Sequence, residues 1–266
     1  MQRLRAISRL VVVVASAAVI AMSQGLQARD LRIMSYNIRN TTGLDGRLDP
    51  ERIAAVIEKV SPEVVAIQEV DSITGRSRGR NLLAEIAGHA GMRHIYAPAI
   101  DYDGGKYGIG ILCKEKPIKQ IRIALPGREE QRALLAVEFK DYVFACTHLS
   151  LTEADRLASL AKIDSVASLF DKPFFIAGDF NSNPGDSFMK LFTEQFDILS
   201  TLKENSFPAD KPEELLDYIA VKKGSGEIVG TKRSKVVEEP IASDHRPVYA
   251  DVVLEQHPDR IISLKP

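Results

Sequence analysis

The stretch "FFIAGDFNSNP" (residues 174–184) joins an apolar run to a cluster of polar groups. Four apolar residues lead through Gly178 into Asp179, and Asn181 follows two positions later. A short apolar run of this kind is typical of a strand that is covered on both faces. A carboxylate and a carboxamide at its end indicate either a turn or part of a site, and the rest of the chain has to decide between the two.

A helical pattern separates two strand-like runs in the first half of the chain. The run "LRIMSYN" ends at Asn37, and residues 64–70 form a second run that carries Glu69. Between them Asp49 suits a helix N-cap, and apolar side chains recur every three or four positions over residues 50–60. This segment therefore predicts a strand, a helix and a second strand, with a polar residue near the end of each strand.

The region around the opening stretch repeats this order. The run "YVFACTHLS" contains His148 near its end, a helical pattern covers residues 152–170, and the next strand ends at Asp179. The polar residues are 32 positions apart in the first unit and 31 in the second. Strand–helix–strand units of this length place parallel strands side by side with their carboxyl ends at one edge. We therefore expect the four polar side chains to meet.

Further strands are predicted by apolar runs at residues 106–114, 132–139, 215–221 and 246–254. Many of these runs are almost wholly apolar instead of alternating, which indicates that both faces of each strand are covered. Two stacked sheets with helices outside them would provide this cover. No linker divides residues 29–266, so we predict a single domain there.

The N-terminal residues 1–28 have the pattern of a signal peptide. Three arginines precede an uncharged apolar run over residues 10–21, which is too short for an ordinary membrane span. We expect a secreted or periplasmic protein; the alternative is an uncleaved membrane anchor. Without this segment the chain has 32 basic and 36 acidic side chains, a net charge of −4, which does not favour a nucleic-acid coat. We also expect a monomer.

The two cysteines, Cys113 and Cys146, both lie in apolar runs. A domain of this size has enough core to be stable without covalent links, so two buried thiols are expected. A disulfide between them is the alternative.

Polar side chains lie at or near the ends of most of the apolar runs. Each is weak evidence alone, since turns also favour such residues. The adjacent pair in "SDHRPV" is more specific, because two titratable groups just before a buried strand have no ordinary structural reason. The full set is Asn37, Glu69, Arg132, His148, Asp179, Asn181, Asp217, Asp244 and His245.

The order of these motifs resembles the endonuclease/exonuclease/phosphatase (DNase-I-like) superfamily of divalent-metal phosphoesterases. The resemblance runs from "SYNIR" through "IQEVD", "YGIGILCK", "THLS", "GDFNSNP" and "LLDYI" to "SDHRPV", almost the whole chain after residue 28. It implies a four-layer α/β/β/α sandwich, which agrees with the strands that are expected to be buried on both faces.

The resemblance also implies a metal site at Glu69, with Asn37 beside it and Asp244 completing the shell. Oxygen ligands of this kind select a hard cation such as Mg²⁺ or Mn²⁺. A cation is also needed because several carboxylates would otherwise repel a phosphate.

The catalytic roles implied by the resemblance fall to six residues. His245 would be the general base for the attacking water, and Asp217 would orient it. Asp179 and Asn181 would align the nucleophile, since residues two apart on a strand face the same way. Arg132 and His148 would offset the charge of the phosphate.

The substrate is less clearly indicated. The loop after Glu69 carries Arg76, Arg78 and Arg80, which either bind a second phosphate or headgroup or are solvated. Tyr107 either contacts substrate or packs. The absence of Trp and the expected export favour a lipid-headgroup or small-molecule phosphodiester, with a phospholipid surface as a partner. The alternatives are a secreted DNase, for which nucleic acid would be the partner, and a pseudoenzyme that binds a phospho-ligand.

Overall fold

The computed structural model describes residues 27–226 and 228–256. Along the chain its elements are β1 (Gln27–Asn37), η1 (Arg39–Thr41), α1 (Pro50–Val60), β2 (Val64–Ser72), α2 (Leu82–His89), β3 (Arg93–Tyr102), β4 (Gly105–Cys113), β5 (Lys119–Leu125), β6 (Arg132–Glu138), β7 (Val143–His148), α3 (Glu153–Ala167), β8 (Phe174–Asp179), α4 (Ser187–Gln195), β9 (Phe196–Ile198), β10 (Asp217–Lys222), β11 (Ile228–Val236) and β12 (Val248–Gln256).

The strands form two six-stranded sheets. The first has the order β11-β12-β1-β2-β4-β3, and the second has the order β5-β6-β7-β8-β10-β9. Two neighbouring pairs are parallel, β1 with β2 and β7 with β8, as the two strand–helix–strand units predict. Each sheet therefore has a parallel pair near its centre and antiparallel strands around it.

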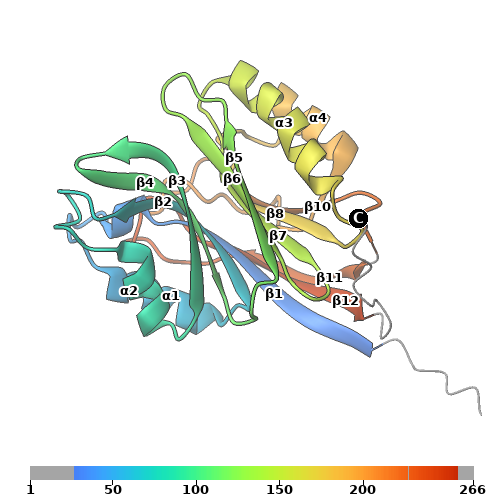
Figure 1. Cartoon of the computed structure of the whole chain (residues 1–266), viewed down its shortest axis with the longest axis horizontal. Helices are drawn as coiled ribbons and strands as arrows, with labels where there is room; N and C mark the ends of the chain where they lie inside the picture. The colour runs from blue at the N-terminus through green and yellow to red at the C-terminus, as the bar shows by residue number, and fades with distance from the viewer. Residues whose placement is uncertain (1–26, 227, 257–266) are drawn as a thin grey trace, which may run out of the picture.

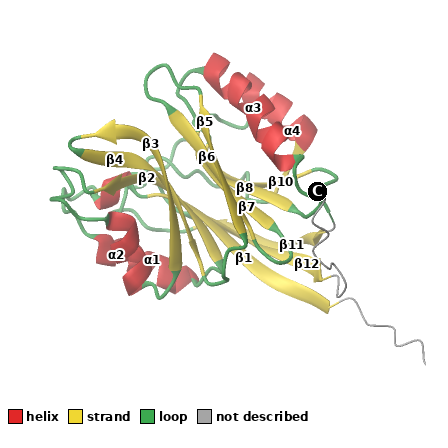
Figure 2. Ribbon diagram, viewed as in Figure 1, coloured by secondary structure: helices red, strands yellow, loops and turns green. Residues whose placement is uncertain are grey.

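The molecule is a four-layer α/β/β/α sandwich (Figures 1 and 2). Helices α1 and α2 cover the outer face of the first sheet, and α3 and α4 cover the outer face of the second. A third apolar cluster fills the space between the sheets. The predicted fold class is therefore confirmed, and three apolar layers explain why many strands have no polar face.

The two predicted helices form close to the expected positions. In α1 the Asp49 carboxylate accepts the backbone N–H of Arg52 at 3.0 Å, and the helix ends at Ser61 in a left-handed conformation. The apolar side chains Ile53 and Ile57 face the first sheet and are buried. Burial of such side chains contributes roughly 1.5–3 kcal/mol each, so the periodic face holds the helix on the sheet.

The layer between the sheets contains both cysteines. Cys113 and Cys146 are buried free thiols, as expected for a core of this size. Cys146 accepts a weak hydrogen bond from Gln68 Nε2 at 3.5 Å. The layer between the sheets thus contains two free thiols and no disulfide between them.

Several elements were not predicted from the pattern, namely α2, α4, β3, β5, β9 and β11. The strand β5 alternates between exposed and partly buried residues because it lies at a sheet edge. One edge strand of the first sheet, β3, contains Pro98 at a register shift, where the missing N–H does no harm. Edge strands have weaker apolar patterns than central ones.

The predicted signal segment lies outside the described residues, apart from Gln27 and Ala28, which pair with β12. The division into segment and single domain stays a prediction. Within the described part of the chain, no helix combines the length and apolar character required to cross a bilayer.

Candidate active site

The carboxyl ends of the two parallel pairs bring four polar side chains together. The Asn37 amide, at the end of β1, donates from Nδ2 to Glu69 Oε1 at 3.0 Å and to Asp179 Oδ2 at 3.1 Å. Asp179 ends β8, and its Oδ2 also lies 3.5 Å from Nε2 of His148, the last residue of β7. The repeated pattern therefore converges on one edge, and Asn37 joins the two sheets there.

Asn37 presents its nitrogen to the carboxylates, not its oxygen. Its Oδ1 accepts the backbone N–H of Arg39 at 3.2 Å. Two acceptor-only carboxylates on either side require a donor between them. Asn37 thus lies beside Glu69, as predicted, and acts here as a hydrogen-bond donor; its place in a metal site stays a prediction.

Glu69 reaches the site because β2 contains a bulge. Gln68 and Glu69 together stand opposite the single residue Ile109 of β4, and Glu69 has a left-handed φ of 58°. Non-glycine residues rarely adopt this conformation, and such strain is concentrated at functional sites. The extra residue turns the carboxylate toward Asn37.

The charge of Glu69 is poorly compensated by the protein. Burial raises the pKa of its carboxyl group, the hydrogen bond from Asn37 lowers it, and the charges of Asp244 and Asp179 raise it again, so that the pKa lies above its usual value. Among the described residues Asn37 is its one hydrogen-bond donor. A half-buried carboxylate in this setting is stabilised by a nearby cation.

His245 is held by a carboxylate. Its Nδ1 lies 2.9 Å from Asp217 Oδ2, which also accepts the Ser206 hydroxyl at 2.6 Å. Its Nε2 lies 3.6 Å from Asp179 Oδ2. Burial lowers the pKa of His245, but the charges of Asp217 and Asp179 and the hydrogen bond to Asp217 outweigh it and raise the pKa to about 10. The predicted pair of His245 and Asp217 is therefore present.

His148 is held in the opposite way, by a cation. Its Nδ1 lies 3.2 Å from Nη1 of Arg132. A guanidinium can only donate, so Nδ1 must accept and the ring proton lies on Nε2. Burial lowers the pKa of His148 to about 4; Asp179 opposes this shift and Arg132 adds to it. His148 is thus a neutral imidazole that points an N–H toward Asp179.

Arg132 is occupied by neighbouring acids. Its Nη1 donates to Glu130 at 3.1 Å and its Nη2 donates to Glu129 at 3.2 Å. Glu129 also accepts the Leu151 backbone N–H at 2.8 Å. The predicted role in offsetting phosphate charge is therefore weakened, because two carboxylates already balance the guanidinium.

Asn181 does not lie on the strand, which corrects the reason given for its role. β8 ends at Asp179, and Asn181 has a left-handed φ of 48°. Its backbone N–H donates to Asp179 Oδ1 at 2.9 Å, and its side-chain Nδ2 donates to the Leu149 carbonyl at 2.9 Å. A tight turn brings Asn181 back beside Asp179, where its N–H fixes the carboxylate.

Asp244 lies at the rim of the same site beside an arginine that the pattern of strand ends does not select. Its Oδ2 is 3.5 Å from Nε of Arg39. Arg39 lies two residues after Asn37 within "SYNIR", which was the available signal. Ser206, Glu129 and Glu130 also contact site residues, but nothing in the sequence indicated this. Each lies in a loop, and the sequence pattern does not predict the path of a loop.

The donor atoms of the site fit a hard divalent cation. Asp179, Asp217 and His245 place one donor atom each within 4.8 Å of one another. However, Asp217 and His245 are hydrogen-bonded to each other, which engages two of these atoms. The carboxylates of Glu69, Asp179 and Asp244 form an oxygen-only set with excess negative charge, and such a set suits Mg²⁺ or Mn²⁺.

The predicted substrate-binding loop is largely tied to the protein itself. Arg76 makes two hydrogen bonds to the buried Asp71, at 2.6 and 2.8 Å, and lies over the rings of Tyr102 and Tyr107. Arg80 pairs with Glu85. Arg78 is exposed, and its guanidinium has no partner among the described residues.

Tyr107 is buried, and after burial itself the charge of Glu69 is the largest cause that raises its pKa. Tyr107 is thus close enough to Glu69 to be affected by its charge, and the guanidinium carbon of Arg76 lies 5.4 Å from the centre of its ring.

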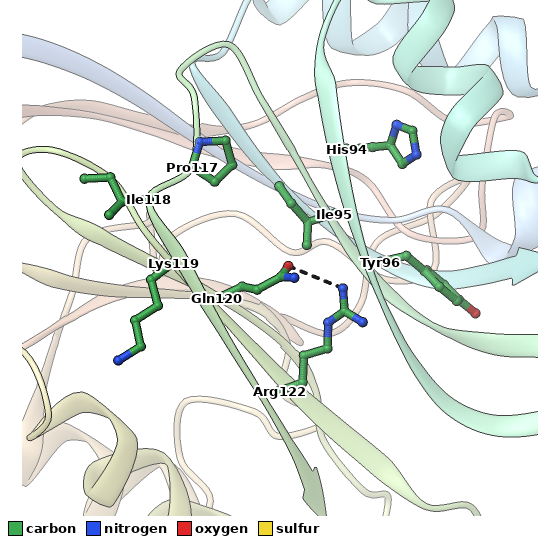
Figure 3. A pocket seen from close by; sticks show the side chains of 8 residues that line it. All are labelled: His94, Ile95, Tyr96, Pro117, Ile118, Lys119, Gln120 and Arg122. Atoms are coloured by element: carbon green, nitrogen blue, oxygen red, sulfur yellow. Dashed lines mark hydrogen bonds between the residues drawn. The ribbon is translucent and has the colours of Figure 1, made fainter.

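The surface also has a hollow of about 500 Å³ between the edge strands β3 and β5 (Figure 3). Its lining includes His94, Tyr96, Lys119 and Arg122. None of the predicted site residues lies there, so this hollow is separate from the polar edge.

Comparison with known sequences gives one family. The profile of the Endonuclease/Exonuclease/phosphatase family matches residues 34–245. These limits enclose every predicted site residue. No curated protein matches the chain significantly.

Solved structures have the same fold at low identity. An endonuclease/exonuclease/phosphatase from Beutenbergia cavernae is 22% identical, with a TM-score of 0.67 over 85% of this chain and 72% of its own. The mannosyl-6-phosphatase of Bacteroides thetaiotaomicron is 18% identical, with a TM-score of 0.68 over 84% of this chain and all of its own (100%). Sphingomyelinase C from Streptomyces griseocarneus is 17% identical, with a TM-score of 0.64 over 84% and 99%.

Proposed function

Because the chain belongs to the Endonuclease/Exonuclease/phosphatase family, we propose that it is a divalent-metal-dependent hydrolase of phosphoric esters, with a phosphodiester as its substrate. The observation that carries the proposal is the pair of differently held histidines. Both direct Nε2 at Asp179 Oδ2, at 3.5 Å for His148 and 3.6 Å for His245. One is a neutral hydrogen-bond donor and the other is paired with a carboxylate, so the first can stabilise a phosphoryl oxygen and the second can accept a proton.

In this proposal water attacks the phosphorus from the side of His245. The water oxygen forms the new P–O bond, and its proton moves to Nε2 of His245, whose Nδ1–H stays on Asp217. The ester P–O bond breaks, and the leaving oxygen departs with the electron pair and takes a proton from solvent. His148 donates a hydrogen bond from its Nε2–H to a phosphoryl oxygen, where negative charge accumulates in the transition state.

A cation would be held by Glu69, Asp179 and Asp244, with Mg²⁺ or Mn²⁺ favoured by the oxygen donors. When bound, it supplies positive charge that polarises a phosphoryl oxygen and offsets the carboxylates. His245 must be neutral to accept a proton, and its pKa of about 10 shows how strongly the unbalanced carboxylates oppose this. A cation among these carboxylates would offset their charge and so favour the neutral ring of His245.

The test is hydrolysis of bis(p-nitrophenyl) phosphate by purified protein with Mg²⁺, with Mn²⁺ and with EDTA. Turnover should need the metal, and Asp179→Asn should reduce it by roughly a hundredfold or more. Asp197→Asn is a matched control, because this exposed side chain lies on β9 of the same sheet. Binding of phosphate without turnover by the wild type would instead indicate a binding protein.

For the natural substrate, we propose a lipid-headgroup or small-molecule phosphodiester. The net charge of −4 for residues 29–266 supports this over nucleic acid, which favours basic surfaces. A panel of sphingomyelin vesicles, phosphoinositides, nucleotides and plasmid DNA separates the classes. Preference for DNA, with activity falling steeply as salt rises, would replace the proposal by a secreted nuclease.

We also propose that the protein is exported. The basic residues and apolar run within residues 1–28 support this. Protein isolated from the native envelope should begin near Arg29 and lie outside the cytoplasm. Recovery of a membrane-bound form that retains Met1 would replace export by anchoring.

A further inference from the structure

The turn that follows β1 has an unusual backbone. Arg39, Asn40 and Thr41 are three consecutive non-glycine residues with left-handed φ values of 43°, 45° and 62°. Such conformations are unfavourable and persist only where the surrounding structure holds them. Here the Thr42 N–H donates to the Arg39 carbonyl at 2.8 Å, and the Asp49 N–H donates to the Thr41 carbonyl at 2.9 Å. The strained turn is therefore held at both ends.

The turn determines where Arg39 lies. Its backbone N–H donates to Asn37 Oδ1 at 3.2 Å, so the residue is fixed directly beside the catalytic edge. Its guanidinium Nε is 3.5 Å from Asp244 Oδ2, and 41% of its side chain is exposed. The side chain thus stands at the mouth of the site with an open side toward solvent.

The guanidinium of Arg39 differs from those of the other site arginines. Arg132, Arg76 and Arg80 each donate hydrogen bonds to a carboxylate. In the described part of the chain, Arg39 has only its ion pair with Asp244, with no hydrogen bond from the guanidinium. Its forked donors are free for an anionic group on a ligand.

We propose that Arg39 is a substrate-binding residue that recognises a second negative charge close to the scissile phosphate ester. Such a charge is either the second ionised oxygen of a phosphate monoester or an anionic group next to a diester. The inference rests on the proposed function, and it narrows the substrate to esters that are more anionic than a simple diester. Forked, charge-assisted hydrogen bonds are the interaction that a guanidinium offers to such a group.

The test compares three chromogenic esters in the presence of Mn²⁺ at pH 8. The first is bis(p-nitrophenyl) phosphate, which has one negative charge, and the second is p-nitrophenyl phosphate, which has two. The third is a nucleoside p-nitrophenyl phosphodiester whose sugar carries a second phosphate group. Arg39→Gln should raise KM about three- to tenfold for the two more anionic esters, a range suited to a half-exposed contact, and should leave the simple diester unchanged. If Arg39→Gln raises KM for only one of the two anionic esters, that ester identifies the group that Arg39 binds: the second ionised oxygen of a monoester or the anionic group next to a diester.

Two further variants separate the forked contact from a general effect of charge. Arg39→Lys keeps the charge but loses the fork, so it should recover part of the lost affinity. Arg47→Gln removes the same charge from the same connection between β1 and α1, where Arg47 is 73% exposed and 3.7 Å from Asp49. Arg47→Gln should leave all three KM values unchanged.

A direct binding measurement separates this inference from the proposed function. Inorganic phosphate is titrated calorimetrically into the Mn²⁺-loaded wild type, Arg39→Gln and Arg47→Gln. Only Arg39→Gln should raise the Kd for phosphate, by about the same three- to tenfold as its KM values. If the wild type hydrolyses no ester, the proposed function fails and this titration still decides the role of Arg39. Equal KM shifts for all three esters, or phosphate binding that Arg39→Gln does not weaken, would overturn the inference.

Discussion

Replacing Asp217 by Asn should stop hydrolysis while the fold persists. The Asp217 carboxylate has two partners: Oδ2 accepts from Ser206 at 2.6 Å and from His245 Nδ1 at 2.9 Å, while the buried Oδ1 has no partner among the described residues. An amide keeps the shape and one acceptor but removes the charge. The amide costs less to bury than the carboxylate, which offsets part of the lost ion pair, so the unfolding free energy of the metal-free protein should fall by up to about 4 kcal/mol, the Coulomb energy of the pair.

The loss of charge should act on His245. Two unit charges about 4 Å apart interact by about 4 kcal/mol at an effective dielectric constant near 20, which corresponds to roughly three pKa units. The pKa of His245 in the metal-free protein should therefore fall from about 10 toward its ordinary value. Turnover should fall by roughly 10³- to 10⁴-fold, as when the orienting carboxylate of a hydrolytic triad is made neutral.

Two measurements check this expectation. Nuclear magnetic resonance of the histidine ring follows the pKa of His245, and hydrolysis of bis(p-nitrophenyl) phosphate at saturating Mn²⁺ gives kcat/KM. Asp197→Asn should change neither quantity. If Asp217→Asn retains turnover within tenfold of wild type, or leaves the pKa of His245 unchanged, the reasoning about this pair is refuted.

Three further predictions concern other parts of the site. Glu69→Gln should lower turnover by roughly a hundredfold or more with an unchanged circular dichroism spectrum, because it removes a positioned charge; near wild-type turnover would remove Glu69 from the site. In EDTA the melting temperature should fall as pH rises from 6.5 through about 10, because the raised pKa of His245 stabilises the fold only while the ring is protonated. The melting temperature should also fall as pH drops from 6.5 through about 4, because the lowered pKa of His148 makes protonation favour the unfolded chain. His245→Gln should flatten the alkaline limb, and persistence of that limb would contradict the assignment. Arg76→Ser should lower the melting temperature by about 5–10 °C, since it strands a buried carboxylate, whereas Arg78→Ser should not; equal effects of the two would show that the loop is not held by this pair.

The parts of the fold that the sequence predicts are those with two buried faces. The central strands β1, β2, β7 and β8 are strongly apolar and have polar residues at or near their ends. The sequence therefore predicts both that they are strands and where their polar residues lie. The edge strands β3 and β5 are half exposed, and their patterns resemble those of loops. A strand can be predicted from its apolar pattern when both of its faces are buried, and the edge strands of these sheets are only partly buried.

The site was predictable in its members but not in its hydrogen bonds. Asn37 and Asp179 lie at strand ends, which their spacing locates. The turn that returns Asn181 and the bulge that turns Glu69 depend on left-handed backbone conformations, for which a non-glycine residue carries no signature. The pairing of Arg132 with two acids depends on a loop beside Glu129 that no periodicity describes.

The position of β12 within the first sheet has a consequence for synthesis of the chain. This strand comes last among the described elements, yet it lies between β11 and β1, and Asp244 and His245 immediately precede it. A chain emerging from the ribosome therefore carries β1 with one side unpaired until residues 248–256 are made. Until then we expect the chain to lack Asp244 and His245 as well, and the open side of β1 to be the part of the first sheet most exposed to wrong pairing.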